Sequence, residues 1–167
     1  MRLAKPPVAE FDPSGQLVKC APSLRIVTDS GLRIPRIDLA PVIRRLCETY
    51  WKDVGGPEQR LNLHLEPLIL DLDRIWLLSE AVRALLSGGL SPGFSPEDGA
   101  IGVHLWSIDR PEQVSILLIA DDGEEAIGEP STPIITSSRR YADRAGCCLI
   151  WQPARGAVWR IHIPERC

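Results

Sequence analysis

The sequence has few aromatic residues and no long apolar run. Aromatic side chains make up 5% of its 167 residues, so aliphatic side chains must supply most of any core. No stretch reaches the roughly 18–20 apolar residues that a membrane-spanning helix needs, and the N-terminus lacks the apolar segment of a secretory signal peptide. We therefore expect a cytoplasmic protein without a membrane span.

Positive charge is not in excess either. Lys and Arg total 19 against 22 Asp and Glu, which gives a formal net charge of −3 and a pI of about 5.6. Sequence-independent binding of DNA or RNA requires clustered Lys and Arg, so the composition argues against a nucleic-acid partner. A local anionic ligand such as ATP is compatible with it.

Metal-binding cysteine pairs and the common catalytic motifs are absent from the sequence. The five cysteines form no Cys-x-x-Cys pair, and the adjacent Cys147 and Cys148 would point to opposite faces of a strand. We expect reduced core thiols and no metal site. The chain also lacks a P-loop, a His-Glu-x-x-His motif and a Gly-x-Ser-x-Gly motif. A Ser–His–Asp or Cys–His set that only folding brings together stays open.

Helical and strand periodicities divide the chain into a short extension and one domain. Residues 1–35 are rich in Pro and Gly and predict short strands and turns, with a hairpin or turn around Phe11–Val18. Residues 36–167 form the predicted domain. Its expected elements are a helix from Asp38, a strand over 61–65, a buried helix over 74–86 capped by Asp71 or Asp73, strands over 101–105 and 114–120, a short helix over 137–145, and a hairpin of strands 147–151 and 158–163.

Strands dominate the second half of this order. The sequence therefore predicts an α+β fold, a two-layer sandwich with helices on one face of a mixed, mostly antiparallel sheet.

Two short motifs occur at defined points of this order. Glu80 lies in the buried helix, within the run Leu77–Val82, and Asp121-Asp122-Gly123 follows an apolar strand. Together with the order of elements over about residues 37–165, these motifs resemble the histidine-kinase-like ATPases. That family has a Glu opening the N box of its central helix and an Asp-x-Gly in its first glycine box. The resemblance implies a nucleotide-binding domain of two-component-type signalling, with ATP or ADP as its ligand.

The resemblance implies roles for four positions. Asp121 would accept a hydrogen bond from the adenine amino group, and Gly123 would let the backbone approach the base. Glu80 is the catalytic candidate, because it would supply an oxygen or orient a water for phosphoryl attack. Ala84 stands where the family has the Asn that holds Mg²⁺, and its methyl group offers no ligand atom. The alternatives are a tight turn ending a strand for Asp121 and a structural acid for Glu80.

Other positions depart from the family pattern. Glu125 replaces the second glycine of the first box, and Ala157 replaces the Thr that often follows the hairpin glycine. The second glycine-rich box, expected between about 126 and 145, is missing. Arg139 and Arg140 stand roughly in its place, where they either contact phosphate or form a solvated face.

The three histidines, His64, His104 and His162, lie at polar positions of predicted strands, and we expect them to be exposed. No phosphoacceptor hairpin precedes residue 37, so we do not expect this chain alone to phosphorylate itself.

The sequence favours a degenerate domain that acts as a pseudo-ATPase and protein-interaction module, with a signalling partner or as a homodimer. One alternative is a genuine ATP- or ADP-binding domain that works with a separate phosphoacceptor protein. Another is an unrelated α+β domain. An open polar cavity between the Glu80 helix and Asp121 would favour nucleotide binding, whereas side chains filling it would favour the pseudo-ATPase.

Overall fold

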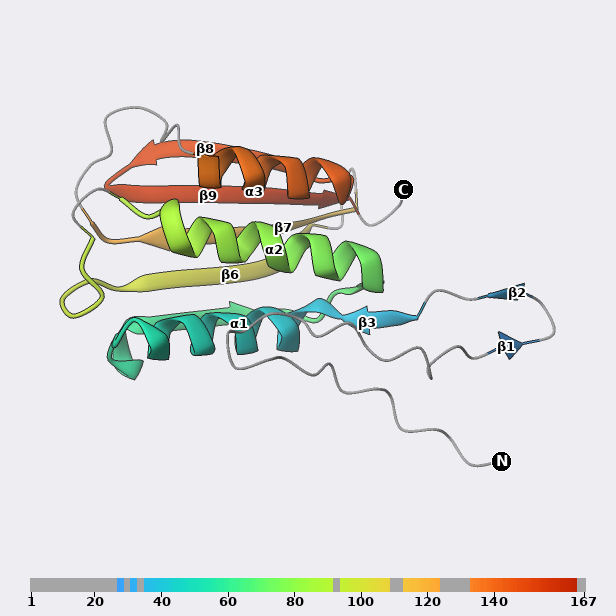
Figure 1. The fold of residues 1–167 in the computed structure, drawn as a ribbon, viewed down its shortest axis with the longest axis horizontal. Helices are drawn as coiled ribbons and strands as arrows, with labels where there is room; N and C mark the ends of the chain where they lie inside the picture. Colours follow the sequence, from blue (N-terminus) through green and yellow to red (C-terminus); the bar gives the residue numbers. More distant parts are fainter. Residues whose placement is uncertain are drawn as a thin grey trace.

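The computed structural model describes residues 27–28, 31–32, 35–91, 94–108, 113–123 and 133–164, and its three helices and large sheet form two layers. Helices α1 (Leu39–Asp53), α2 (Leu72–Gly88) and α3 (Pro133–Arg144) lie together on one side of a five-stranded sheet (Figure 1). The predicted α+β sandwich with helices on one face is therefore confirmed. None of the helices within these ranges is long and apolar enough to cross a bilayer.

The large sheet has the spatial order β4-β6-β7-β9-β8. Its strands are β4 (Leu61–Leu65), β6 (Ile101–Ile108), β7 (Val114–Asp121), β8 (Cys148–Ala154) and β9 (Gly156–Pro164). Strand β4 runs parallel to β6, and the other three pairings are antiparallel. This pairing confirms the predicted mixed, mostly antiparallel sheet.

Two further strand pairs precede or flank the helices. Strand β3 (Arg36–Asp38) pairs with β5 (Ile69–Asp71), and β1 (Val27–Thr28) pairs with β2 (Gly31–Leu32). The predicted hairpin or turn around Phe11–Val18 lies outside the described residues.

Helix α1 begins where the sequence predicts, with Asp38 as its N-cap. One oxygen of Asp38 accepts hydrogen bonds from the backbone N–H of Ala40 at 3.1 Å and of Leu68 at 2.9 Å. After α1, a single 3₁₀ turn, η2 (Glu58–Arg60), leads into β4. The apolar face of α1 is buried against the sheet and α2; its buried residues are Leu39, Ala40, Val42, Ile43, Leu46, Cys47 and Trp51.

Helices α2 and α3 pack against each other; α2 covers the central strands β6 and β7, and α3 covers β9 and the edge strand β8. Helix α2 is buried around much of its circumference, as its apolar sequence predicts. Asp71 occupies its N-cap position, but its side chain makes no capping bond. Helix α3 starts at Pro133, four residues earlier than predicted, because proline is well suited to the first turn of a helix.

The β8–β9 hairpin is tighter than predicted. Gln152 pairs with Val158, and Ala154 pairs with Gly156, so the turn is confined to the region around Arg155. Gly156 has a φ of 81°, a left-handed conformation that glycine adopts without steric cost. At the start of β8, Cys147 is buried and Cys148 is exposed, which confirms that the two thiols point to opposite faces.

The sheet face opposite the helices carries the three histidines. His64 is exposed as predicted, and its ring centroid lies 6.2 Å from that of His104. His104 and His162 are half-buried, so the prediction that they are exposed was wrong for these two. Both lie on interior strands of the sheet, where side chains of the neighbouring strands cover part of each ring.

Candidate functional site

Asp121 ends strand β7 and is 5% exposed. Its Oδ2 accepts hydrogen bonds from the backbone N–H of Ser91 at 2.9 Å and of Ala157 at 3.3 Å. Its Oδ1 accepts from the backbone N–H of Gly123 at 2.9 Å and from the Ser91 hydroxyl. Three segments that are far apart in the sequence therefore donate to one buried carboxylate.

These four donors use the full acceptor capacity of the Asp121 side chain. An ionised carboxylate offers about four lone-pair sites, two on each oxygen. Two donors lie on Oδ1 and two on Oδ2, and all four come from this chain. An adenine amino group would have to displace one of them, and the Ser91 hydroxyl is the one that can rotate away.

At the two glycines beside Asp121, close contacts leave no room for a side chain. A Cβ on Gly123 would lie 1.9 Å from Ser91 Oγ, and a Cβ on Gly156 would lie 1.9 Å from the backbone oxygen of Asp121. The space that Gly123 leaves open is thus used by the chain itself, at the position where the resemblance implies contact with a base.

The loop after α2 is tied to the sheet at a second point. The indole N–H of Trp159, in β9, donates to the carbonyl of Gly89 at 2.6 Å, and Trp159 is fully buried. Sequence reasoning did not single out Ser91 or Trp159. Both act through partners 30 or 70 positions away, so no local motif identifies them.

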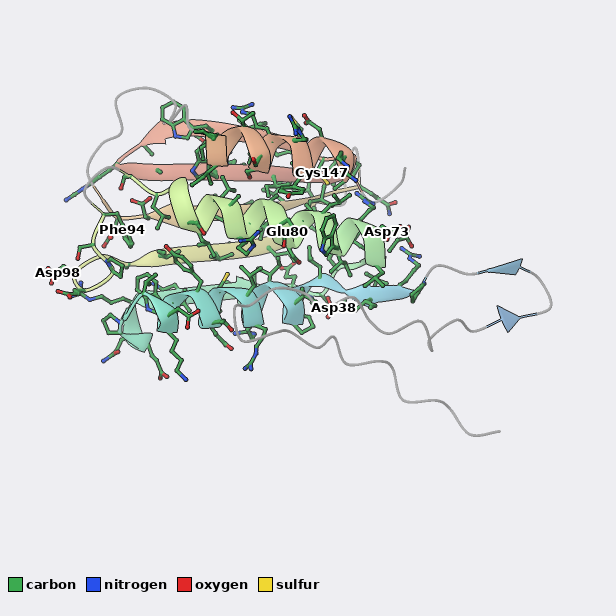
Figure 2. The ribbon with its side chains drawn as sticks, viewed as in Figure 1. Asp38, Asp73, Glu80, Phe94, Asp98 and Cys147 are labelled. Atoms are coloured by element: carbon green, nitrogen blue, oxygen red, sulfur yellow. The ribbon has the colours of Figure 1, made fainter. Side chains whose placement is uncertain are left out.

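Glu80 lies midway along α2, and it is 8% exposed (Figure 2). Its Oε2 accepts from Nη2 of Arg83 at 2.6 Å, an ion pair one helical turn along. Eight residues separate Glu80 from the C-terminal end of α2 at Gly88, which corresponds to about 12 Å along the axis. Asp121 is bonded to Ser91, just beyond that end, so Glu80 lies at the middle of α2 whereas Asp121 lies near its C-terminal end.

The residues expected at the metal position do not fit Mg²⁺. Ala84 is half-buried one turn after Glu80 and has no side-chain oxygen, and the Glu80 carboxylate is paired with Arg83. Magnesium requires near-octahedral oxygen ligands. Within the described ranges, no group of three or more potential ligand side chains occurs.

Helix α3 packs closely on the C-terminal half of α2, in the segment where the second glycine-rich box was expected. The buried Ser138 hydroxyl donates to the carbonyl of Ala81 at 3.0 Å. Ile134 covers Gly88, because a Cβ there would lie 2.8 Å from Ile134 Cδ1. In this helix Arg139 is half-buried and Arg140 is exposed. Glu125 lies outside the described residues.

Comparison with known proteins gives structural matches and no sequence match. No protein-family model and no curated protein matches the chain. The histidine kinase domain of the Erythrobacter litoralis EL346 blue-light activated histidine kinase superposes with a TM-score of 0.61 at 17% identity, over 77% of this chain and 66% of that one. A structure described as the EL346 blue-light activated histidine kinase itself gives a TM-score of 0.62 at 16% identity, over 77% of this chain and 42% of that one.

A mycobacterial sensor histidine kinase, MprB, gives a TM-score of 0.55 at 20% identity, over 78% of this chain and 97% of that one. The chain spans less than two thirds of the two Erythrobacter structures. At these identities the similarity concerns the fold. The chain has the fold of the histidine kinase ATPase domains, as its motifs and element order predicted.

Proposed function

We propose that this chain is a degenerate histidine-kinase-like ATPase domain that acts as a cytoplasmic pseudo-ATPase in two-component-type signalling. It works by contacting a signalling protein or a second copy, and it does not hydrolyse ATP. The observation that carries this proposal is the Asp121 carboxylate, whose four acceptor sites are filled by Ser91, Gly123 and Ala157.

The bonds to Asp121 oppose adenine recognition energetically. If the adenine amino group takes the place of the Ser91 hydroxyl, that buried hydroxyl loses its acceptor. Leaving a buried donor unsatisfied costs about 1–3 kcal/mol, which corresponds to roughly a 5- to 150-fold loss of affinity. A nucleotide that used Asp121 would therefore have to displace a bond within the protein, which lowers its affinity.

The region expected to hold phosphate adds to this argument. Glu80 is paired with Arg83, Ala84 offers no magnesium ligand, and Ile134 covers Gly88. A nucleotide would thus lack the metal bridge that offsets the repulsion between its phosphates and the carboxylates of the protein.

Calorimetric titration with ADP and ATP, with and without Mg²⁺, tests the proposal. We expect no saturable heat up to millimolar nucleotide and no change in melting temperature. A ligand at 100 times its Kd would add about 2.7 kcal/mol to the free energy of unfolding, which a melting curve detects readily. A nucleotide-binding histidine kinase ATPase domain in the same buffer is the positive control.

One observation favours a second candidate, a genuine ATP- or ADP-binding domain that works with a separate phosphoacceptor protein. The turn in which Asp121 accepts from the Gly123 N–H at 2.9 Å has the Asp-x-Gly spacing of the first glycine box. Saturable ADP binding by the wild-type chain would overturn the pseudo-ATPase in favour of this candidate.

A further inference from the structure

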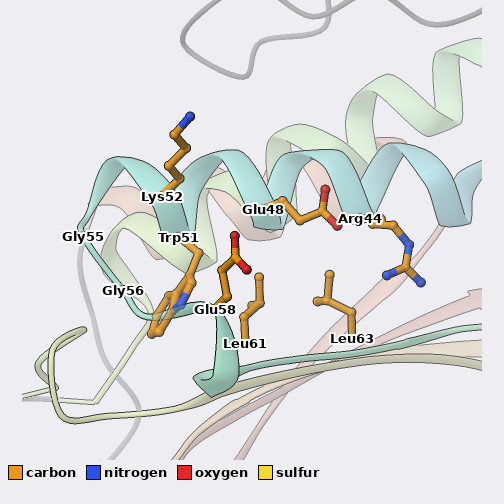
Figure 3. A pocket seen from close by; sticks show the side chains of 9 residues that line it. All are labelled: Arg44, Glu48, Trp51, Lys52, Gly55, Gly56, Glu58, Leu61 and Leu63. Carbon is orange, nitrogen blue, oxygen red and sulfur yellow. The ribbon is translucent and has the colours of Figure 1, made fainter.

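A groove opens between helix α1 and the edge strand β4, on the margin of the two layers (Figure 3). It has a volume of about 700 Å³. Leu61 and Leu63 point from β4 into it, and both are half-buried. The groove is separate from the Asp121 site, because Asp121 lies on β7, with β6 between that strand and β4.

The outer edge of β4 borders this groove. Within the described ranges, no strand pairs with β4 on the side away from β6. The N–H of Glu66 donates to the carbonyl of Leu105 in β6. Because successive residues of a strand direct their backbone groups to opposite sides, those of Leu63 and Leu65 point away from β6. These groups offer an edge to which a further strand can hydrogen-bond.

Charged side chains of α1 form the opposite wall. Arg44, Glu48 and Lys52 are exposed, are spaced four residues apart and line the groove. They therefore alternate in sign along one helix face, with a rise of about 6 Å between neighbours. In Figure 3 the ammonium group of Lys52 points away from β4, and its flexible four-carbon stem lets it turn toward a bound segment. Neither ion pair found among the described residues includes any of these three side chains.

We propose that this groove binds an extended peptide segment of a partner protein, which adds to β4 as a sixth strand. Alternate residues of a strand are about 6.6 Å apart, close to the spacing of the charges on α1. The segment recognised has an acidic residue facing Arg44, a basic residue facing Glu48 and an acidic residue facing Lys52. Affinity comes from main-chain hydrogen bonds to the edge, and specificity from these side chains.

The leucine floor suits the central basic residue of the bound segment. The aliphatic stem of a lysine packs on Leu61 and Leu63 while its ammonium group reaches the Glu48 carboxylate. Glu58, at the start of η2, also lines the groove and adds a second carboxylate for that ammonium. The groove thus combines an apolar floor with uncommitted charges of both signs.

The test uses a fluorescein-labelled peptide, Thr-Asp-Val-Lys-Val-Asp-Thr, titrated with the full chain and followed by fluorescence anisotropy. We expect saturable binding. The double variant Arg44→Glu/Lys52→Glu weakens it at least tenfold and instead binds the charge-reversed peptide, Thr-Lys-Val-Asp-Val-Lys-Thr. Because this variant gains a ligand, a folding defect cannot produce the result. Arg45→Glu is the matched control, since Arg45 is exposed on α1 outside the groove.

Amide hydrogen exchange supplies a second readout that is specific to strand addition. In the peptide complex the Leu63 and Leu65 amides gain protection, whereas the His64 amide, on the β6 side, changes little. Binding without protection of Leu63 and Leu65 would overturn strand addition. Absence of binding, or equal effects of Arg44→Glu/Lys52→Glu and Arg45→Glu, would overturn the proposal as a whole.

A second copy of the chain is the competing occupant. If protection of the Leu63 and Leu65 amides rises with protein concentration in the absence of peptide, the occupant of the groove is a second copy of the chain, and the proposal of a partner peptide is overturned. The inference concerns a site distinct from Asp121, so nucleotide titration of the same preparation separates the two proposals. If both the peptide and ADP bind, only the pseudo-ATPase proposal is overturned. If neither of them binds, only the groove proposal is overturned.

Discussion

Among single residues, Asp121 determines how the loops beside β7 are held. Its carboxylate joins the end of α2, the turn after β7 and the β8–β9 hairpin through bonds to Ser91, Gly123 and Ala157. The side chain that the resemblance assigns to a ligand is therefore also a structural centre of the apoprotein. Its removal should affect stability as well as any binding.

Replacing this carboxylate by an amide tests its structural role. In Asp121→Asn one oxygen becomes an NH₂ group, so at least one backbone N–H loses its acceptor. We expect the free energy of unfolding to fall by about 3 kcal/mol, at roughly 1–3 kcal/mol for each unsatisfied donor. Denaturant unfolding measures this change.

Asp122→Asn is the control for that experiment. The Asp122 side chain accepts a single bond, from the N–H of Ala100 at 2.7 Å in an exposed position, and an amide oxygen can replace it. Its cost should stay below about 1 kcal/mol. Equal destabilisation by the two variants would contradict the role given to Asp121.

Cys47 makes a prediction about alkaline pH. Burial against the core raises the pKa of its thiol from 9.0 to about 12, with a smaller contribution from Glu48. Below pH 9 the thiol is protonated in both states and has no effect. Above pH 9 the unfolded chain loses the proton first, so the free energy of unfolding falls by roughly 1 kcal/mol per pH unit up to about pH 12.

Unfolding of wild type and Cys47→Ala between pH 8 and pH 11 measures this contribution. The free energy of unfolding of the variant should differ from that of wild type by a constant amount below pH 9. Above pH 9 it should fall less steeply with pH. Burial also raises the pKa of Tyr50, but Tyr50 is present in both proteins and cancels in the comparison. Parallel slopes would show that the thiol does not contribute.

Among the elements, the helix starts differ in how firmly they are capped. Asp38 accepts two backbone bonds at the start of α1, whereas Asp71 makes no side-chain capping bond at the start of α2. Asp38→Ala should therefore cost about 2 kcal/mol. Asp71→Ala should cost less than about 1 kcal/mol, because it loses only an exposed ion pair with Arg36. If thermal unfolding shows equal losses of stability for the two variants, the Asp38 cap does not stabilise α1 more than Asp71 stabilises α2.

Periodicity predicted most elements because their apolar faces are continuous in sequence. The i, i+3, i+4 spacing of Leu39, Val42 and Ile43 places α1, and the alternation of Leu61 and Leu63 places β4. The start of α3 was predicted too late because Pro133 has the same local signature in a loop and in a first helical turn.

Sequence patterns could not predict the long-range contacts of the candidate site. The Glu80–Arg83 pair follows from helical spacing and is foreseeable. The bond from Ser91 to Asp121 joins residues 30 positions apart, and only the folded α2 loop brings them together. The order of elements predicted where Asp121 lies, but not what its carboxylate binds.

In the whole molecule, a single helix layer covers one face of the sheet, and the Asp121 site and the proposed peptide groove lie apart on it. Asp121 ends β7 in the interior of the sheet, and the groove of Arg44, Glu48 and Lys52 lies along the edge at β4. Because they are separate, nucleotide binding at the Asp121 site can be lost while peptide binding in the groove is kept. A domain that no longer binds nucleotide can thus retain a surface for a protein partner.

The amide resonances of Ser91 and Gly123 during an ADP titration test the central claim most directly, because both N–H groups donate to Asp121. The account predicts that neither resonance shifts up to millimolar ADP, with or without Mg²⁺. A saturable shift of both resonances that Asp121→Asn eliminates would contradict it, because the carboxylate would then be open to the base.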